Sequence, residues 1–217
     1  MTVNGVAQGC RSKPERQGSM NKDTLIAHVR KNEDGSWAPP QPLINHLEGS
    51  ARLASKFAET FDSSAWGYAE GIGHDTGKGK PPWQQYIKRE SGYDEEAHLE
   101  TKPGKRDHSS PSAKLVEDVY GKGVGRILSY CIAGHHAGLP DWTGSQSSLS
   151  FRLQNSKTSD IPRKYRDDLS ISNPLIPPWK FDNTGLDMSL WIRMLFFYAV
   201  EIRLLGMDKL IPEKGGY

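Results

Sequence analysis

Apolar residues recur three or four positions apart over most of this chain, the spacing of one face of a helix. The clearest run extends from Leu43 to Phe61 and predicts an amphipathic helix that carries His46. Similar spacing predicts further helices at about 64–74, from Pro82 onward, at 109–120, at 124–132, and from Asp187 or Ser189 to Leu205. We expect the last of these to be a central core helix.

Other segments lack this spacing. Leu25 to Val29 predicts a short strand or an extended lead-in, and the charged stretch 90–107 predicts a loop. Residues 143–178 are polar and interrupted by prolines, so we expect irregular connections and one short helix at about 149–153. Residues 1–19 predict a loose tail, and residues 20–217 one domain. The sequence thus predicts an all-α fold with long irregular loops.

Composition narrows the classes of partner. Twenty-eight Lys and Arg against 26 Asp and Glu give a net charge of +2, which excludes a broad basic field, so any nucleic-acid contact must be local. Cys10 and Cys131 lie in unlike contexts and predict no disulfide framework. No signal-peptide core is visible, and the apolar run 195–200 is too short to cross a bilayer. We therefore expect a cytoplasmic protein without a membrane partner.

The residues that could bind a metal lie mostly near the ends of the predicted helices. The adjacent pair His74 and Asp75 cannot share one helix face, so the two side chains can reach two metals or bridge them. A buried Asp75 would need a metal or a salt bridge to Lys78. The potential ligands are His46, His74, Asp75, His108, His135 and His136, and this imidazole-rich set favours Mn, Fe, Ni, Co or Zn, with Mg also admissible.

The histidines also have an ordinary interpretation. Any one of them could be a partly buried hydrogen-bonding residue, and His28 and His98 have no ligand-like neighbour in the sequence. The pair His135 and His136 is flanked by glycines that let both rings turn inwards. Gly77-Lys-Gly-Lys80 lacks the spacing of a phosphate-binding loop, so no ATP site is predicted.

Several motifs carry a family resemblance. The order of these histidines and of Asp75 resembles the HD superfamily of metal-dependent phosphohydrolases. More closely, the chain is similar to the HD nuclease domain of the CRISPR-associated nuclease-helicase of type I systems, over about 25–205. The segments that carry this resemblance are Ala27-His-Val-Arg30, Leu43-Ile-Asn-His-Leu-Glu-Gly49, Gly73-His-Asp-Thr-Gly-Lys78, Asp107-His-Ser-Ser110 and Gly134-His-His-Ala-Gly-Leu-Pro-Asp-Trp142.

The resemblance implies an HD-domain helical bundle and a nuclease with two divalent transition metals. His46 and His74 would hold one metal, while His108, His135 and His136 would hold the other. Asp75 would bridge both, and Lys78 would meet the scissile phosphate. The implied activity is hydrolysis of single-stranded DNA, endonucleolytic and compatible with exonuclease action, in type I CRISPR interference and antiviral defence. The implied partners are a helicase subunit or domain and an RNA-guided surveillance complex.

One motif departs from the family. The last helix normally supplies a further aspartate to the first metal, whereas here the stretch reads Ala199-Val-Glu-Ile-Arg-Leu204. Glu201 could reach a metal, but Arg203 would repel one. Two alternatives therefore stay open: an HD-type nucleotide phosphohydrolase, and a catalytically impaired HD binding module.

Overall fold

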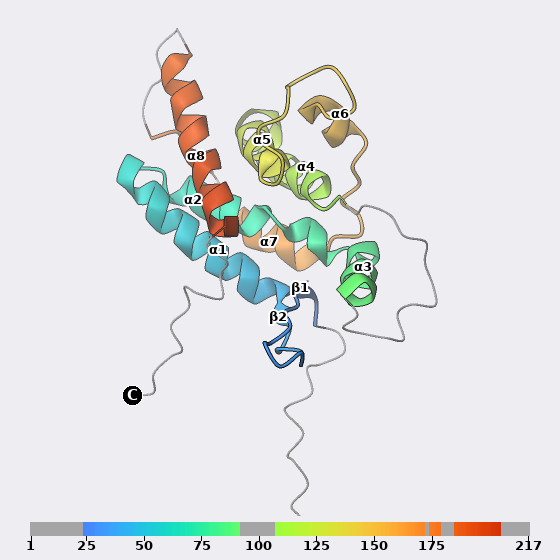
Figure 1. Cartoon of the computed structure of the whole chain (residues 1–217). Helices are drawn as coiled ribbons and strands as arrows, with labels where there is room; N and C mark the ends of the chain where they lie inside the picture. The colour runs from blue at the N-terminus through green and yellow to red at the C-terminus, as the bar shows by residue number, and fades with distance from the viewer. Residues whose placement is uncertain (1–23, 92–106, 172–173, 179–184, 205–217) are drawn as a thin grey trace, which may run out of the picture.

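The computed structural model of the protein describes residues 24–91, 107–171, 174–178 and 185–204, with side chains for all of these except 90–91 and 198–204. This part of the chain is mostly helical with one small two-stranded sheet (Figure 1). The expected all-α class is therefore confirmed, and the predicted tail lies outside the described residues. The elements are β1 (Ile26–His28), β2 (Gln41–Pro42), α1 (Leu43–Ala58), η1 (Glu59–Phe61), α2 (Ser64–Gly73), η2 (Thr76–Gly79), α3 (Pro81–Ser91), α4 (Ser109–Tyr120), η4 (Gly121–Gly125), α5 (Arg126–Gly134), α6 (Leu149–Gln154), α7 (Arg163–Ser170) and α8 (Leu186–Leu204).

Helices α1 and α2 cross with almost no side chain between them. A Cβ added at Gly71 would lie 2.4 Å from Ala51 Cα, and one at Gly67 would lie 2.4 Å from the carbonyl oxygen of Ala54. Only glycine permits so close an approach of two backbones. This contact fixes the relative position of the side chains that the two helices carry.

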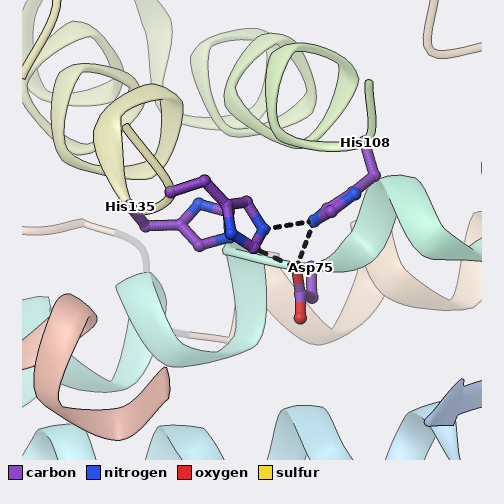
Figure 2. A group of neighbouring side chains, drawn as sticks. Asp75, His108 and His135 are labelled. Atoms are coloured by element: carbon purple, nitrogen blue, oxygen red, sulfur yellow. Dashed lines mark hydrogen bonds and ion pairs between the residues drawn. The ribbon is translucent and has the colours of Figure 1, made fainter. Parts of the chain in front are cut away.

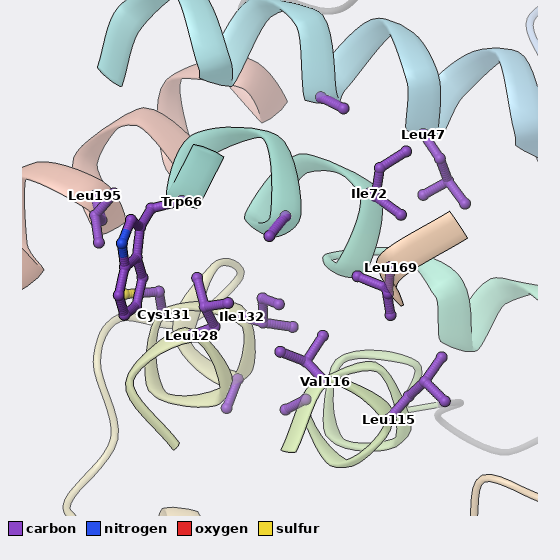
Figure 3. Close-up of a cluster of buried hydrophobic side chains, with 14 of the residues drawn as sticks. Leu47, Trp66, Ile72, Leu115, Val116, Leu128, Cys131, Ile132, Leu169 and Leu195 are labelled. Atoms are coloured by element: carbon purple, nitrogen blue, oxygen red, sulfur yellow. The ribbon is translucent and has the colours of Figure 1, made fainter. Parts of the chain in front are cut away.

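A single large cluster of buried side chains joins α1, α2, α4, α5, α7 and α8 (Figure 3). Trp66 and Trp191 meet edge to face, with their ring centroids 4.6 Å apart. The indole N–H of Trp191 donates to Ser63 Oγ at 2.8 Å, so the one polar atom of this buried ring has a partner. The rest of the cluster includes Leu47, Ile72, Leu115, Val116, Leu128, Ile132, Leu169 and Leu195.

The strand expected near Leu25 is confirmed as β1, which pairs antiparallel with β2. A side-chain amide attaches it to the following helices. The Ile26 N–H donates to Gln84 Oε1 at 2.9 Å, while Gln84 Nε2 donates to the carbonyl oxygens of Ile26 at 2.9 Å and Lys78 at 2.8 Å. Strand β1 is thus held against the segment that follows α2.

Ser63 occupies the N-cap position of α2, but its hydroxyl does not cap the helix. The hydroxyl instead donates to the Phe61 carbonyl oxygen at 3.0 Å and accepts the indole N–H of Trp191. A tertiary partner has therefore taken the oxygen that would otherwise accept a helix N–H.

The prediction that 163–170 is irregular is wrong, because α7 occupies it. Only Tyr165 and Leu169 of this short helix are buried, four positions apart, and the rest of it is charged or polar. Two apolar positions are too few to establish a helical period. The helix forms because these two side chains dock into the common core.

The expectation that α8 is a central core helix holds for only one edge of it. Leu190 and Phe197 are 60% and 58% exposed, whereas Trp191 and Leu195 are almost fully buried. Helix α8 thus packs on the core by one edge and presents other apolar residues to solvent. No helix in the described ranges has both the length and the apolar character needed to span a membrane.

Candidate metal centre

The structure brings together all six side chains that the sequence nominates as ligands. His46 lies in the first turn of α1, and His74 and Asp75 directly follow α2. His108 immediately precedes α4, and His135 and His136 immediately follow α5. Figure 2 shows His108 and His135 converging on Asp75 from two different helices.

Gly77 brings the His74-Asp75 turn against the start of α4. A Cβ at this position would lie 2.1 Å from the carbonyl oxygen of His108, and the Gly77 N–H donates to Ser112 Oγ at 2.8 Å. Only glycine, which has no Cβ, fits at this position between the two segments. The close approach is what carries His108 to Asp75.

The side chain of Asp107 stabilises the start of α4. The Asp107 carboxylate accepts the backbone N–H of Ser110 at 3.0 Å and the Ser109 hydroxyl at 3.0 Å. Arg152 donates to both serine hydroxyls. These bonds fix the backbone on either side of His108.

One oxygen of Asp75 faces a first group of imidazoles. Asp75 Oδ2 lies 2.9 Å from His46 Nε2 and 3.2 Å from His74 Nε2, and the two nitrogens are 3.1 Å apart. With bonds of about 2.1 Å, two ligand atoms at right angles around one ion lie about 3.0 Å apart. The first group therefore has the spacing of three atoms that share an ion.

The other oxygen faces a second group. Asp75 Oδ1 lies 3.1 Å from His108 Nε2 and 3.5 Å from His135 Nε2, and His136 Nε2 is 2.8 Å from His108 Nε2. One ligand atom from each of these four residues falls within 4.8 Å of all the others. This mostly buried group could bind a metal ion.

Two backbone carbonyls orient the rings. His74 Nδ1 donates to the Gly71 carbonyl oxygen at 2.8 Å, and His135 Nδ1 donates to that of Ile132 at 2.6 Å. A carbonyl oxygen can only accept, so Nδ1 carries the proton and Nε2 of a neutral ring presents its lone pair to Asp75. Such a hydrogen bond at the far nitrogen is typical of metal-binding histidines.

The protonation states suit a cation. Burial lowers the pKa of His46 to about 4 and also lowers that of His135. Burial by itself would raise the pKa of Asp75, but the neighbouring Lys78 ammonium outweighs it and holds that pKa well below its usual range. Neutral imidazoles around an ionised carboxylate are the forms that metals bind.

Asp75 Oδ1 is buried and makes no hydrogen bond with any residue that the structure describes. Its nearest nitrogens include the lone-pair side of His135, which repels a carboxylate oxygen. A buried carboxylate oxygen in such surroundings is costly unless a cation lies beside it. The residues present therefore fit a metal, and their imidazole-rich chemistry favours transition metals.

Lys78 provides the salt bridge that the sequence suggested. Its Nζ lies 2.8 Å from Asp75 Oδ2, and both side chains are almost fully buried. Nζ also lies 5.3 Å from the centroid of the Trp83 ring. The candidate site therefore already contains one cation of the protein itself.

His28 is the residue that the sequence analysis missed. Its ring lies beside that of His46, with centroids 4.8 Å apart, and Lys78 Nζ donates to its Nε2 at 3.1 Å. His28 forms a further potential ligand group with His46 and Asp75. The resemblance included its segment Ala27-His-Val-Arg30 but assigned His28 no role, and the partners of His28 are distant along the chain.

Other candidates lie outside this cluster or outside the described residues. Trp142 is 47% exposed and packs beside Tyr130. His98 lies outside the described residues, as do the side chains of Glu201 and Arg203 at the departure from the family motif. A scan of protein-family models and a search of curated proteins find no match to this chain.

Proposed function

We propose that the protein is a metal-dependent phosphodiesterase of the HD type that cleaves single-stranded DNA. The observation that supports this most strongly is that the two carboxylate oxygens of Asp75 each face a separate group of imidazole nitrogens. One carboxylate so placed can bridge two ions. The motif resemblance supplies the choice of substrate and the proposed work with a helicase and a surveillance complex.

Bound divalent ions would supply hydroxide near neutral pH and charge for the oxygens around phosphorus. The chain contributes positioning and access. Asp75, His74 and His135 are buried and hold the geometry, whereas His28 and His136 are exposed. A phosphodiester would approach over this exposed edge.

Lys78 is the proposed phosphate contact. A lysine ammonium is a compact point charge that suits a phosphate oxygen. In the structure it neutralises Asp75, at 2.8 Å. With divalent ions on the carboxylate, the ammonium is no longer needed there and can pair with the substrate.

The direct test is cleavage of circular single-stranded DNA by the purified protein with Mn²⁺ or Ni²⁺. Nicking should depend on the metal and disappear in Asp75→Ala, whereas Asp167→Ala, which alters an exposed carboxylate, should retain wild-type activity. Equal rates for Asp75→Ala and the wild type would refute the proposal. Activity on mononucleotides or cyclic nucleotides with intact circular DNA would instead favour the nucleotide phosphohydrolase.

A further inference from the structure

We infer that His28 is a ligand of the metal held by the first group, so that strand β1 contributes a ligand to this site. The inference rests on the proposed metal dependence and gives a ligand role to His28, to which the family resemblance assigned none. Its basis is the grouping of His28 with His46 and Asp75, in which one ligand atom of each lies within 4.8 Å of the others.

The tautomer of His28 follows from its partner. An ammonium group can only donate, so His28 Nε2 must accept in its 3.1 Å contact with Lys78 Nζ and must present a lone pair. The same Nζ also donates to Asp75 Oδ2, at 2.8 Å. Two electron-pair donors from separate segments are therefore already aimed at one cationic position.

That position continues the first group. Asp75 Oδ2, which faces the ammonium, also lies 2.9 Å from His46 Nε2 and 3.2 Å from His74 Nε2. His28, His46 and Asp75 each offer one ligand atom within 4.8 Å of the others, so an ion held at Oδ2 could take His28 as a further ligand. Three imidazoles and one carboxylate are a common donor set for first-row transition metals.

The ammonium must move when an ion takes its position, because two cations at contact distance repel each other strongly. Lys78 has a second partner at hand, since the centroid of the Trp83 ring lies 5.3 Å from Nζ. The substrate phosphate is a third. An ion that binds beside His28 would therefore displace the Lys78 ammonium from Asp75, so that metal binding frees the lysine for another partner.

Strand β1 is rigid enough to hold a ligand. Gln84 makes two hydrogen bonds of 2.9 Å to the backbone of Ile26, and a third of 2.8 Å to the carbonyl oxygen of Lys78. One amide thus fixes the strand that carries His28 and the turn that carries Lys78. Their separation is set by the backbone and is independent of any bound ion.

The test is titration of the chelator-treated protein with Co²⁺ or Ni²⁺ by calorimetry, with the Co²⁺ absorption spectrum as a second readout. Wild type should bind two ions per chain. His28→Ala should weaken one of them by at least about tenfold and change its spectrum, leaving the other unchanged. Arg30→Ala, on an exposed residue that follows the same strand, should match the wild type.

His28→Gln separates ligation from positioning. Glutamine keeps an acceptor for Lys78 but is a poor ligand for these metals, so it should weaken binding as much as alanine does. Lys78→Met should tighten binding at the same site, because the competing ammonium is gone. Wild-type affinities and spectrum in both His28 variants would overturn the inference, as would recovery of wild-type binding in His28→Gln alone.

Cleavage assays on the same samples distinguish this inference from the proposed function. Two ions, one of them dependent on His28, without cleavage of DNA would overturn the function and support the ligand. Metal-dependent cleavage with unchanged metal affinity in His28→Ala would do the reverse.

Discussion

Substitution of Asp75 by asparagine should strongly destabilise the metal-free protein. The carboxylate is buried and lies 2.8 Å from Lys78 Nζ, which is buried as well. At an effective dielectric constant of about 20, two unit charges at this separation attract each other by about 6 kcal/mol, which offsets the cost of removing both from water. Asparagine keeps the shape but leaves the ammonium without its counter-ion.

The expected loss is about 3–5 kcal/mol of unfolding free energy, the usual effect of removing one partner from a buried pair. Lys78→Met in the same chain removes the stranded charge, so the double variant should be more stable than the sum of the two single changes predicts. We expect a coupling of at least about 2 kcal/mol between the two sites.

Guanidinium unfolding in the presence of a chelator measures these values. The matched control is Glu48→Gln, which breaks an exposed 3.9 Å pair with Arg52 and should cost less than about 1 kcal/mol. A loss below about 1 kcal/mol for Asp75→Asn, or strict additivity with Lys78→Met, would show that the pair does not carry the predicted energy.

Three further predictions concern packing and titration. Gly71→Ala should lower the unfolding free energy by at least about 2 kcal/mol, because its Cβ would lie 2.4 Å from Ala51 Cα, and Gly123→Ala, whose Cβ meets nothing within 4 Å, is the control in the same unfolding series. Burial raises the pKa of Glu70 well above 4.5, so stability should fall as pH rises from that value, and thermal melts of Glu70→Gln should lack this decline. Burial lowers the pKa of His46 from 6.5 to about 4, so the unfolded chain takes up the proton first. The stability of the metal-free protein should therefore fall as pH drops through that range, and His46→Gln should flatten the fall; parallel curves for the variant and the wild type would contradict either titration.

The helices that position the candidate site could be predicted because their signals are local. The apolar period from Leu43 to Phe61 sets α1, and the glycines around His74 and His135 mark helix ends. Histidines near such ends attract attention in the sequence alone. Their convergence on the two oxygens of Asp75 is a tertiary property that only the structure supplies.

The missed features depend on distant partners. His28 comes near Asp75 because Gln84, which is 58 residues from Ile26 in sequence, holds the strand. The buried face of α8 is likewise chosen by a partner, since Ser63 receives the indole N–H of Trp191. Apolar residues around much of that helix left its period ambiguous.

The carbonyl oxygens of Gly71 and Ile132 that orient His74 and His135 belong to the backbone of α2 and α5. Every residue type has such an oxygen, so a substitution at Ile132 leaves the partner of the His135 ring in place as long as the helix persists. Gly71 is required by the close approach of α1 and not by its bond to His74, since that bond uses the backbone alone. A comparison that looks for conserved supporting side chains around this cluster would overlook the groups that hold two of its rings.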